Sequence, residues 1–299
     1  MGHIITDLKE AFRRGNVYIQ LIFINVGVFV ITTLIGILLQ LFNRSAAGIF
    51  ELLALPASFT RFAWQPWSIF TYMFMHAGFL HILFNMLWLY WFGALFLYFF
   101  SGNHLRGLYI VGGICGGLLY MISYNVFPYF RPMTAYSTMV GASASVLAIV
   151  VATAYREPNY PVRLLFFGNV RLKYLALIVV LTDLLFITSS NAGGHIAHLG
   201  GALAGLWFAA SLNKGKDITS WVNKALDAIA ALFSAKTWKR KPRMKVHYGN
   251  NTRQNDYDYN ARKKAQSDEI DRILDKLKKS GYESLTTEEK KSLFDASKR

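Results

Sequence analysis

Cysteine and acidic residues are scarce in this sequence of 299 residues, and each scarcity excludes a class of protein. The single cysteine, Cys115, has no partner in the chain and lies in an apolar run, which excludes a disulfide scaffold, a zinc ribbon and thiol redox chemistry. Charged residues make up 16% of the chain and hydrophobic residues 54%, whereas a soluble domain has about 25% charged residues. This composition excludes a disordered or collagen-like chain and indicates a protein whose main solvent is lipid.

The net charge of +15 is divided unevenly along the chain. Residues 1–213 contain 11 Lys/Arg and 5 Asp/Glu, whereas residues 214–299 contain 21 Lys/Arg and 12 Asp/Glu. A basic tail next to an apolar body is typical of a protein that contacts anionic lipids. We expect no nucleic acid partner, because no recognition motif accompanies the charge.

Six segments are long and apolar enough to be membrane spans across about 30 Å of hydrocarbon. We place them at 19–42, 79–100, 105–124, 139–155, 173–189 and 193–212. The last three are short or interrupted by small and polar residues. The sequence therefore predicts an all-α membrane protein with a bundle of six transmembrane helices.

Basic residues predict the orientation of these spans, because short cytoplasmic loops are rich in Lys and Arg. Basic residues precede the first span and follow the sixth, and they occupy the second–third and fourth–fifth links. The alternate loops hold only Arg44, Arg61 and Arg131. Both termini are then cytoplasmic, and we expect a multi-pass protein of the cell membrane, a bacterial inner membrane. The first apolar run, about 24 residues, is too long for a cleavable signal peptide.

Three polar clusters lie inside the predicted spans, where polar side chains are costly and usually functional. His81 and Asn85 are four residues apart and share one face of the second span. Residues 141–145 read Gly-Ala-Ser-Ala-Ser, and residues 194–201 read Gly-His-Ile-Ala-His-Leu-Gly-Gly. All three clusters begin spans that run inward, so they lie at one depth, roughly 3–10 Å below the outer surface. They are placed to converge on one cavity.

A serine, a histidine and hydrogen-bond donors at one depth indicate acyl transfer. A histidine would take the proton of the serine as general base. The Ser143 backbone N–H and the side chains of His81 and Asn85 would stabilise the oxyanion, each such donor contributing about 10²–10³ in rate.

Spacing alone leaves two choices open. Ser143 and Ser145 face nearly opposite sides of a helix, so only one of them can be the nucleophile, and either His195 or His198 can be the base. Asp183, the only carboxylate inside a span, lies past the middle of the fifth span. No acidic residue is therefore expected to orient the histidine, and we predict a Ser-His dyad.

Other interpretations of these residues compete with catalysis. A lone membrane serine often bonds a helix carbonyl, a histidine at a span end often lies at the interface, and the seam Gly200, Gly201 and Gly205 favours close helix packing. An intramembrane metalloprotease would draw on the histidines, but the sequence lacks a His-Glu-x-x-His string. A transporter is disfavoured because no inverted repeat is visible.

The strings around these residues resemble the rhomboid family of intramembrane serine proteases over roughly residues 60–212. The resemblance is carried by Phe70-Thr-Tyr-Met-Phe-Met-His76, by His81-Ile-Leu-Phe-Asn85, by the Gly-x-Ser string and by His-Leu-Gly-Gly. It implies that Ser143 is the nucleophile, that His198 is the base, and that His81 and Asn85 form the oxyanion site. His76 matches a nearby family histidine that is structural rather than catalytic, and we expect supporting roles for Gly141, His76 and His195.

The resemblance also implies an activity. The chain would hydrolyse a peptide bond in or near a transmembrane segment of another membrane protein, close to the outer face, without a metal or cofactor. The alternative is an inactive rhomboid-like protein that binds membrane segments without cutting them. Two positions depart from the family pattern: Ala144 follows the serine where glycine is common, and Ser68 follows Trp67 where arginine is common.

The tail is predicted to be a separate set of elements. Residues 217–233 have the spacing of an amphipathic helix, either on the inner membrane surface or packed on the body, and the basic run 236–245 would contact anionic lipid. Two short helices are expected near 267–279 and 286–297, after a polar linker at 250–260 and with a Thr286-x-x-Glu289 capping box. This part resembles a tail module of some bacterial rhomboid-like proteins.

The predicted domain organisation has four parts. They are a cytoplasmic segment 1–18, a six-span domain 19–213, a basic amphipathic helix and linker 214–265, and a small helical hairpin 266–299.

Overall fold

The computed structural model describes residues 12, 15–164, 168–233 and 252–297. The chain divides into two compact units, Met1–Thr237 and Trp238–Arg299, and each is described by itself. Most of the predicted segment 1–18 and the whole basic run 236–245 lie outside the described residues.

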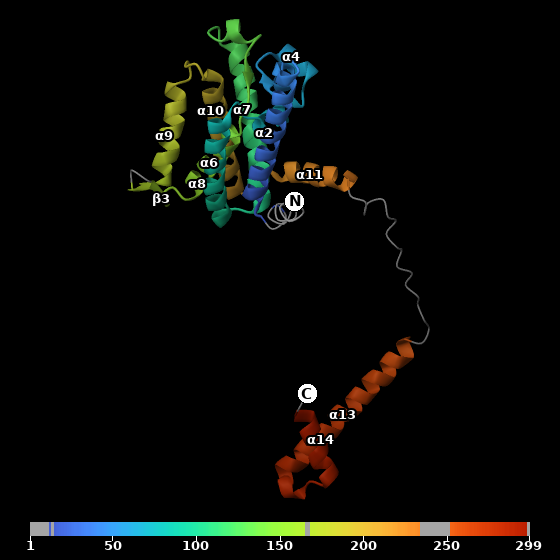
Figure 1. Cartoon of the computed structure of the whole chain (residues 1–299). Helices are drawn as coiled ribbons and strands as arrows, with labels where there is room; N and C mark the ends of the chain where they lie inside the picture. Colours follow the sequence, from blue (N-terminus) through green and yellow to red (C-terminus); the bar gives the residue numbers. More distant parts are fainter. Residues whose placement is uncertain (1–11, 13–14, 165–167, 234–251, 298–299) are drawn as a thin grey trace. The chain divides into compact units, whose positions relative to one another are not determined.

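The predicted spans coincide with six helices in the described part of the first unit, which run alongside one another in Figure 1. These are α2 (Val17–Leu41), α6 (Phe79–Phe99), α7 (Gly102–Val126), α8 (Ser143–Arg156), α9 (Leu172–Leu185) and α10 (Ala192–Asn213).

The helices differ in length. The helices α2, α6, α7 and α10 are long and apolar enough to cross a membrane. With 14 residues each, α8 and α9 rise only about 21 Å, less than the hydrocarbon thickness of about 30 Å. The chain is therefore a mostly helical membrane protein with four long apolar helices and shorter ones beside them.

The short helix α8 forms the centre of this unit. Every residue from Ala144 to Ala154 is buried, and α8 packs against α10, α7, α6 and α9. In contrast, α2 exposes large apolar side chains such as Ile31 and Leu38, as a helix at a lipid-facing surface does. Burial of its apolar side chains on all sides holds α8 in place.

Glycines let α10 approach α8 closely, as the seam in the sequence predicts. A Cβ added at Gly201 would lie 2.8 Å from the carbonyl carbon of Ala144, and one added at Gly205 would lie 3.1 Å from the Cα of Ala148. On another side of α10, a Cβ at Gly200 would lie 2.8 Å from the Cα of Gly116 in α7. The three helices therefore pack backbone against backbone.

Short strands modify the all-α class that the sequence predicts. Strand β1 (Leu55–Pro56) pairs antiparallel with β2 (Thr138–Met139), and β3 (Pro161–Leu164) pairs antiparallel with β4 (Gly168–Arg171). These pairs connect loops rather than spans, where hydropathy gives no signal. The pair β1–β2 joins the long loop after α2 to the segment that leads into α8.

The loop between α2 and α6 is ordered by short helices and side-chain hydrogen bonds. The helices are α3 (Ala47–Leu53), α4 (Phe59–Trp64), α5 (Ser68–Thr71) and the 3₁₀ turn η1 (Tyr72–Phe74). The Trp67 indole N–H donates to the Leu52 carbonyl at 2.9 Å, and Arg61 forms an ion pair with Glu51 at 3.4 Å. A second 3₁₀ turn, η2 (Arg131–Met133), follows α7.

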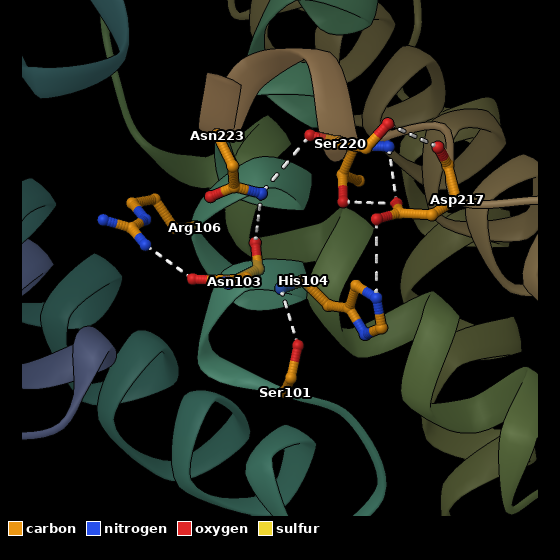
Figure 2. Close-up of polar contacts among 8 residues, drawn as sticks. Ser101, Asn103, His104, Arg106, Asp217, Ser220 and Asn223 are labelled. Atoms are coloured by element: carbon orange, nitrogen blue, oxygen red, sulfur yellow. Dashed lines mark hydrogen bonds and ion pairs between the residues drawn. The ribbon is translucent and has the colours of Figure 1, made fainter. Parts of the chain in front are cut away.

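Helix α11 (Ser220–Phe233) runs at a steep angle to the bundle helices and projects sideways from the bundle (Figure 1), and it contacts α7. The Asn223 side chain donates to the Asn103 carbonyl at 3.0 Å, and Asp217 faces His104 with 3.6 Å between Oδ2 and Nε2 (Figure 2). Val222 is buried, whereas Trp221 is 51% exposed. The start of the predicted amphipathic helix therefore packs on the body, while part of its apolar surface stays exposed.

The second unit is a helical hairpin. It contains α13 (Thr252–Ser280), a 3₁₀ turn η3 (Tyr282–Ser284) and α14 (Thr287–Ser297). Helix α13 begins well before residue 267, so residues 252–260 are helical rather than a linker. The sequence analysis missed the beginning of α13, because these polar residues give no apolar periodicity.

The capping box before α14 is present as predicted. The Thr286 N–H donates to Glu289 Oε2 at 2.8 Å, and the Glu289 N–H donates to Thr286 Oγ1 at 3.3 Å. Lys276 donates to the same carboxylate at 2.8 Å and holds the pKa of Glu289 below its usual value. This exposed contact fastens α13 to α14.

Candidate active site

Ser143 is the first residue of α8, where helix backbone N–H groups have no partner within the helix. Two residues earlier, Gly141 has a φ of +137°, which an L side chain rarely adopts, and its N–H donates to the Tyr72 carbonyl at 2.9 Å. This bend turns the chain into α8, and the partial positive charge of the helix start lies beside the serine.

His198 comes from α10, which the glycine seam holds against α8. A polar cavity of about 550 Å³ has Ser143, His198, His81 and Asn85 in its lining. No direct hydrogen bond joins Ser143 to His198 among the described residues, but hydrogen bonds of this kind are often long without substrate and tighten when it binds. The predicted convergence of the three clusters on one cavity is thus observed.

A second cavity of about 200 Å³ shares Asn85, Ser143 and His198 with the first. Its other lining side chains are apolar: Phe84, Trp88, Val146, Leu147 and Val179. The serine therefore lies between a polar space, which suits water, and an apolar one, which suits a side chain of a membrane segment.

His81 and Asn85 present donors beside the serine. A Cβ added at Gly141 would lie 3.0 Å from His81 Nε2 and 3.6 Å from Ser143 Oγ, so both atoms border the space that glycine leaves free. The Ala77 N–H approaches His81 Nδ1 at 3.4 Å, which favours the tautomer with its proton on Nε2. Asn85 Nδ2 uses one of its hydrogens for the His81 carbonyl at 2.9 Å and keeps the other available.

The structure distinguishes Ser143 from Ser145, which the spacing in the sequence could not do. Ser145 is completely buried, and a Cβ at Gly113 of α7 would lie 2.8 Å from its Oγ. It lines neither of the two cavities, whereas Ser143 lines both. Ser145 is a packing residue between α8 and α7.

The histidine has an acidic partner, so the expectation that no carboxylate could orient it is wrong. Asp183 Oδ1 lies 2.8 Å from His198 Nδ1 and 2.8 Å from His195 Nδ1. Helix α9 ends at Leu185, which puts Asp183 in its last turn, and α10 begins a few residues later. The short connection brings the carboxylate to the level of both histidines.

These three side chains also have the composition of a metal site. Among the described residues, they form the group of possible ligands that lie close enough together to hold a metal ion. Asp183, His195 and His198 each offer an atom within 4.8 Å of the others. A metal would require both Nδ1 atoms without their protons. At 2.8 Å from one carboxylate oxygen, the two Nδ1 atoms instead have the spacing of hydrogen-bond donors.

A family model for the Rhomboid domain matches residues 63–214, about half of the chain and all of the helices from α6 to α10. The chain belongs to the rhomboid family. The mitochondrial RHOMBOID-like protein 12 of Arabidopsis thaliana is 29% identical over 158 residues, which cover 50% of this chain and 47% of that protein. The matched segment therefore spans about half the length of this rhomboid relative. A family of unknown function, DUF6576, matches residues 254–299.

The two departures from the rhomboid pattern are accommodated. Ala144 is buried where α10 crosses α8, with Gly201 supplying the space for close contact. Ser68 is completely buried in the loop before α6. In the same loop, Arg61 donates to the Ala135 carbonyl at 3.4 Å and pairs with Glu51.

His76 does not line the cavity that holds Ser143 and His198, and it is 2% exposed, just before α6. Burial lowers the pKa of His76 to about 4, with a further lowering by His81, whose ring lies 5.1 Å away, and a small opposite effect from the Phe74 backbone. His76 therefore stays neutral in the folded protein at physiological pH and packs beside the ring of His81.

We expect the stability of this rhomboid to fall in mild acid because of His76. An unfolded chain protonates this histidine near pH 6.5, but the folded chain does so only near pH 4, so stability is present at neutral pH and is lost as pH falls between these values. The loss from pH 7.5 to pH 5 should be about 2 kcal/mol. Thermal unfolding in detergent at both pH values checks it: His76→Phe should show a correspondingly smaller loss, and an equal loss in the variant would contradict this origin.

Proposed function

We propose that this rhomboid is an intramembrane serine endopeptidase that cuts transmembrane segments of other membrane proteins. The observation that carries the proposal is that Ser143 and His198, from two different helices, line the same polar cavity. Family membership supports it, because the nucleophile and base positions of the family pattern are both occupied.

In the proposed reaction, Ser143 Oγ attacks the carbonyl carbon of the scissile peptide while His198 Nε2 accepts its proton. The tetrahedral oxyanion is stabilised by the Ser143 backbone N–H at the start of α8, by His81 Nε2–H and by Asn85 Nδ2–H. His198 then gives the proton to the leaving amine. Water enters through the polar cavity, and the same base activates it to hydrolyse the acyl-enzyme.

The substrate must leave its helix before it can react, because helical carbonyls are hydrogen-bonded and screened. We therefore expect cutting near the end of a transmembrane segment, at small residues and close to Gly, Pro or another helix-weakening residue. The apolar cavity of about 200 Å³ beside Ser143 suits one small or medium apolar side chain of such a segment. No metal or cofactor is required by this chemistry.

The proposal includes six spans with both termini cytoplasmic, so that the cavity opens near the outer face. In this orientation, α11 lies at the inner membrane surface, where the exposed side chains of Trp221 and Ile229 would enter the interface. The basic residues that follow would contact anionic lipids.

Labelling with a fluorophosphonate probe tests the proposal directly. The purified wild type in detergent should be labelled covalently, Ser143→Ala should not be labelled, and Ser145→Ala, which changes a buried serine on the same helix, should be labelled like the wild type. A cleavage assay with a transmembrane model substrate should follow the same order.

Either of two results would reject the endopeptidase. A wild type that is neither labelled nor active would favour the inactive, segment-binding relative. Labelling that persists in Ser143→Ala would move the nucleophile elsewhere.

A further inference from the structure

We propose that Asp183 is a positioning residue for His198, which holds in place the imidazole of the proposed Ser-His pair. This inference rests on the proposed function and adds a third member to its machinery. Asp183 belongs to α9, and His198 to the neighbouring helix α10 (Figure 1).

The contact has the geometry of a strong hydrogen bond. His198 Nδ1 lies 2.8 Å from Asp183 Oδ1, within the range of charge-assisted bonds. The Asp183 side chain is only 5% exposed, and that of His198 is 22% exposed. The carboxylate is thus buried and lines neither cavity, whereas the imidazole lines both and is open enough to meet a substrate.

This contact decides which nitrogen of His198 carries the proton. A carboxylate oxygen can only accept, so Nδ1 must be the protonated nitrogen. Nε2 is then left with a free lone pair, which a general base for Ser143 needs. When the base has taken the proton, the negative charge of Asp183 stabilises the imidazolium at a distance of one hydrogen bond.

His195 supports the carboxylate rather than competing for the reaction. Its Nδ1 also lies 2.8 Å from Asp183 Oδ1, and its side chain is 20% exposed. A buried carboxylate is costly unless hydrogen bonds satisfy it, and Asp183 Oδ2 is buried with no hydrogen-bond partner among the described residues. The two histidine N–H groups on Oδ1 therefore hold the carboxylate in place.

The rival explanation is that Asp183 only fastens α9 to α10. A fastening role predicts a loss of folded protein when the carboxylate is removed, with normal turnover in the molecules that remain folded. A positioning role predicts that folded molecules bind substrate normally and turn it over slowly.

Kinetics of full-length variants in detergent separate these roles, with a transmembrane model substrate and with rates divided by the folded fraction from thermal unfolding. In Asp183→Asn, the amide can donate to His198 Nδ1 and shift the proton to Nε2. We expect kcat to fall about 10²- to 10⁴-fold with KM within about threefold of the wild type. Asp183→Glu, which keeps a carboxylate, should recover at least tenfold of that loss. Thr182→Val, which removes an exposed hydroxyl from the adjacent position of α9, should match the wild type.

Each result has one meaning. A wild-type kcat in folded Asp183→Asn would overturn the inference while Ser143-dependent cleavage by the wild type left the proposed function intact. A loss explained entirely by the folded fraction, or by KM, would also overturn it in favour of fastening. Absence of Ser143-dependent cleavage in the wild type would instead defeat the proposed function itself.

Discussion

Replacement of His198 with alanine is expected to lower kcat for a transmembrane substrate by about 10⁴- to 10⁶-fold while leaving KM within a few-fold of the wild type. Without the imidazole, Ser143 has no group in the cavity to take its proton, because His81 is held in the tautomer that donates from Nε2. The hydroxyl itself is a very weak nucleophile at neutral pH. Cleavage rates of the purified variant, measured under saturating substrate, check this expectation.

A double variant tests whether Ser143 and His198 act together in one proton transfer. Residues that act as a unit lose activity together, so Ser143→Ala combined with His198→Ala should be no slower than either single variant. His104→Gln is the matched control, because this histidine lies at the start of α7 beside Asp217 and far along the chain from the polar clusters. Multiplicative losses in the double variant would show that the two residues do not act on one proton transfer.

Replacement of Gly201 with valine is expected to disrupt both folding and catalysis. Any Cβ at this position would lie 2.8 Å from the Ala144 carbonyl carbon and 3.0 Å from its Cα, and a backbone cannot move aside as a flexible side chain can. Helix α10 must then shift away from α8. We expect a loss of about 3 kcal/mol in stability, at the upper end of overpacking effects.

The same shift moves His198 away from Ser143, because Gly201 lies one turn beyond His198 on α10. A displacement of about 1 Å costs roughly 10²-fold in rate, so kcat of the folded fraction should fall by that factor. Gly27→Val in α2, where an added Cβ meets nothing within 4 Å, is the control and should retain both stability and activity. Normal activity in a folded Gly201→Val protein would mean that the seam does not set the distance between the two helices.

Hydropathy and spacing were sufficient to predict the six helices of the bundle and the convergence of the three polar clusters on one cavity. The spans have long apolar runs, and side chains four residues apart on one helix, such as His81 and Asn85, must share a face. Clusters at the starts of spans with the same direction must also share a depth. These are local properties of the chain, so they can be derived without knowing which helices are neighbours.

The contact of Asp183 with the two histidines could not be derived in that way, because it depends on where α9 ends. A fifth span drawn to residue 189 places Asp183 well inside the membrane, whereas the helix ends at Leu185. The sequence nonetheless contained a feature that predicts this contact. A carboxylate near the end of one span and histidines near the start of the next, joined by a short link, must lie at similar depth.

Spacing also does not tell which of the two histidines that contact Asp183 lies on the side of α10 that faces Ser143. His195 and His198 are both reachable from the end of α9, and only the packing of α10 on α8 decides which one also faces Ser143. The strands β1 and β2 were missed for a related reason, since two-residue strands leave no periodic pattern.

The shortness of α8 has a consequence for the depth of the reaction. If Arg156, which ends this helix and is exposed, lies at one interface, a rise of about 21 Å leaves Ser143 about 9 Å short of the opposite one. The longer helices α6, α7 and α10 around it would then extend past Ser143 toward that interface, so that the proposed nucleophile lies at the bottom of a recess. In the proposed protease, the length of α8 would therefore set how deep a peptide must enter to be cut, and one residue added to the start of α8 would bring Ser143 about 1.5 Å nearer the surface.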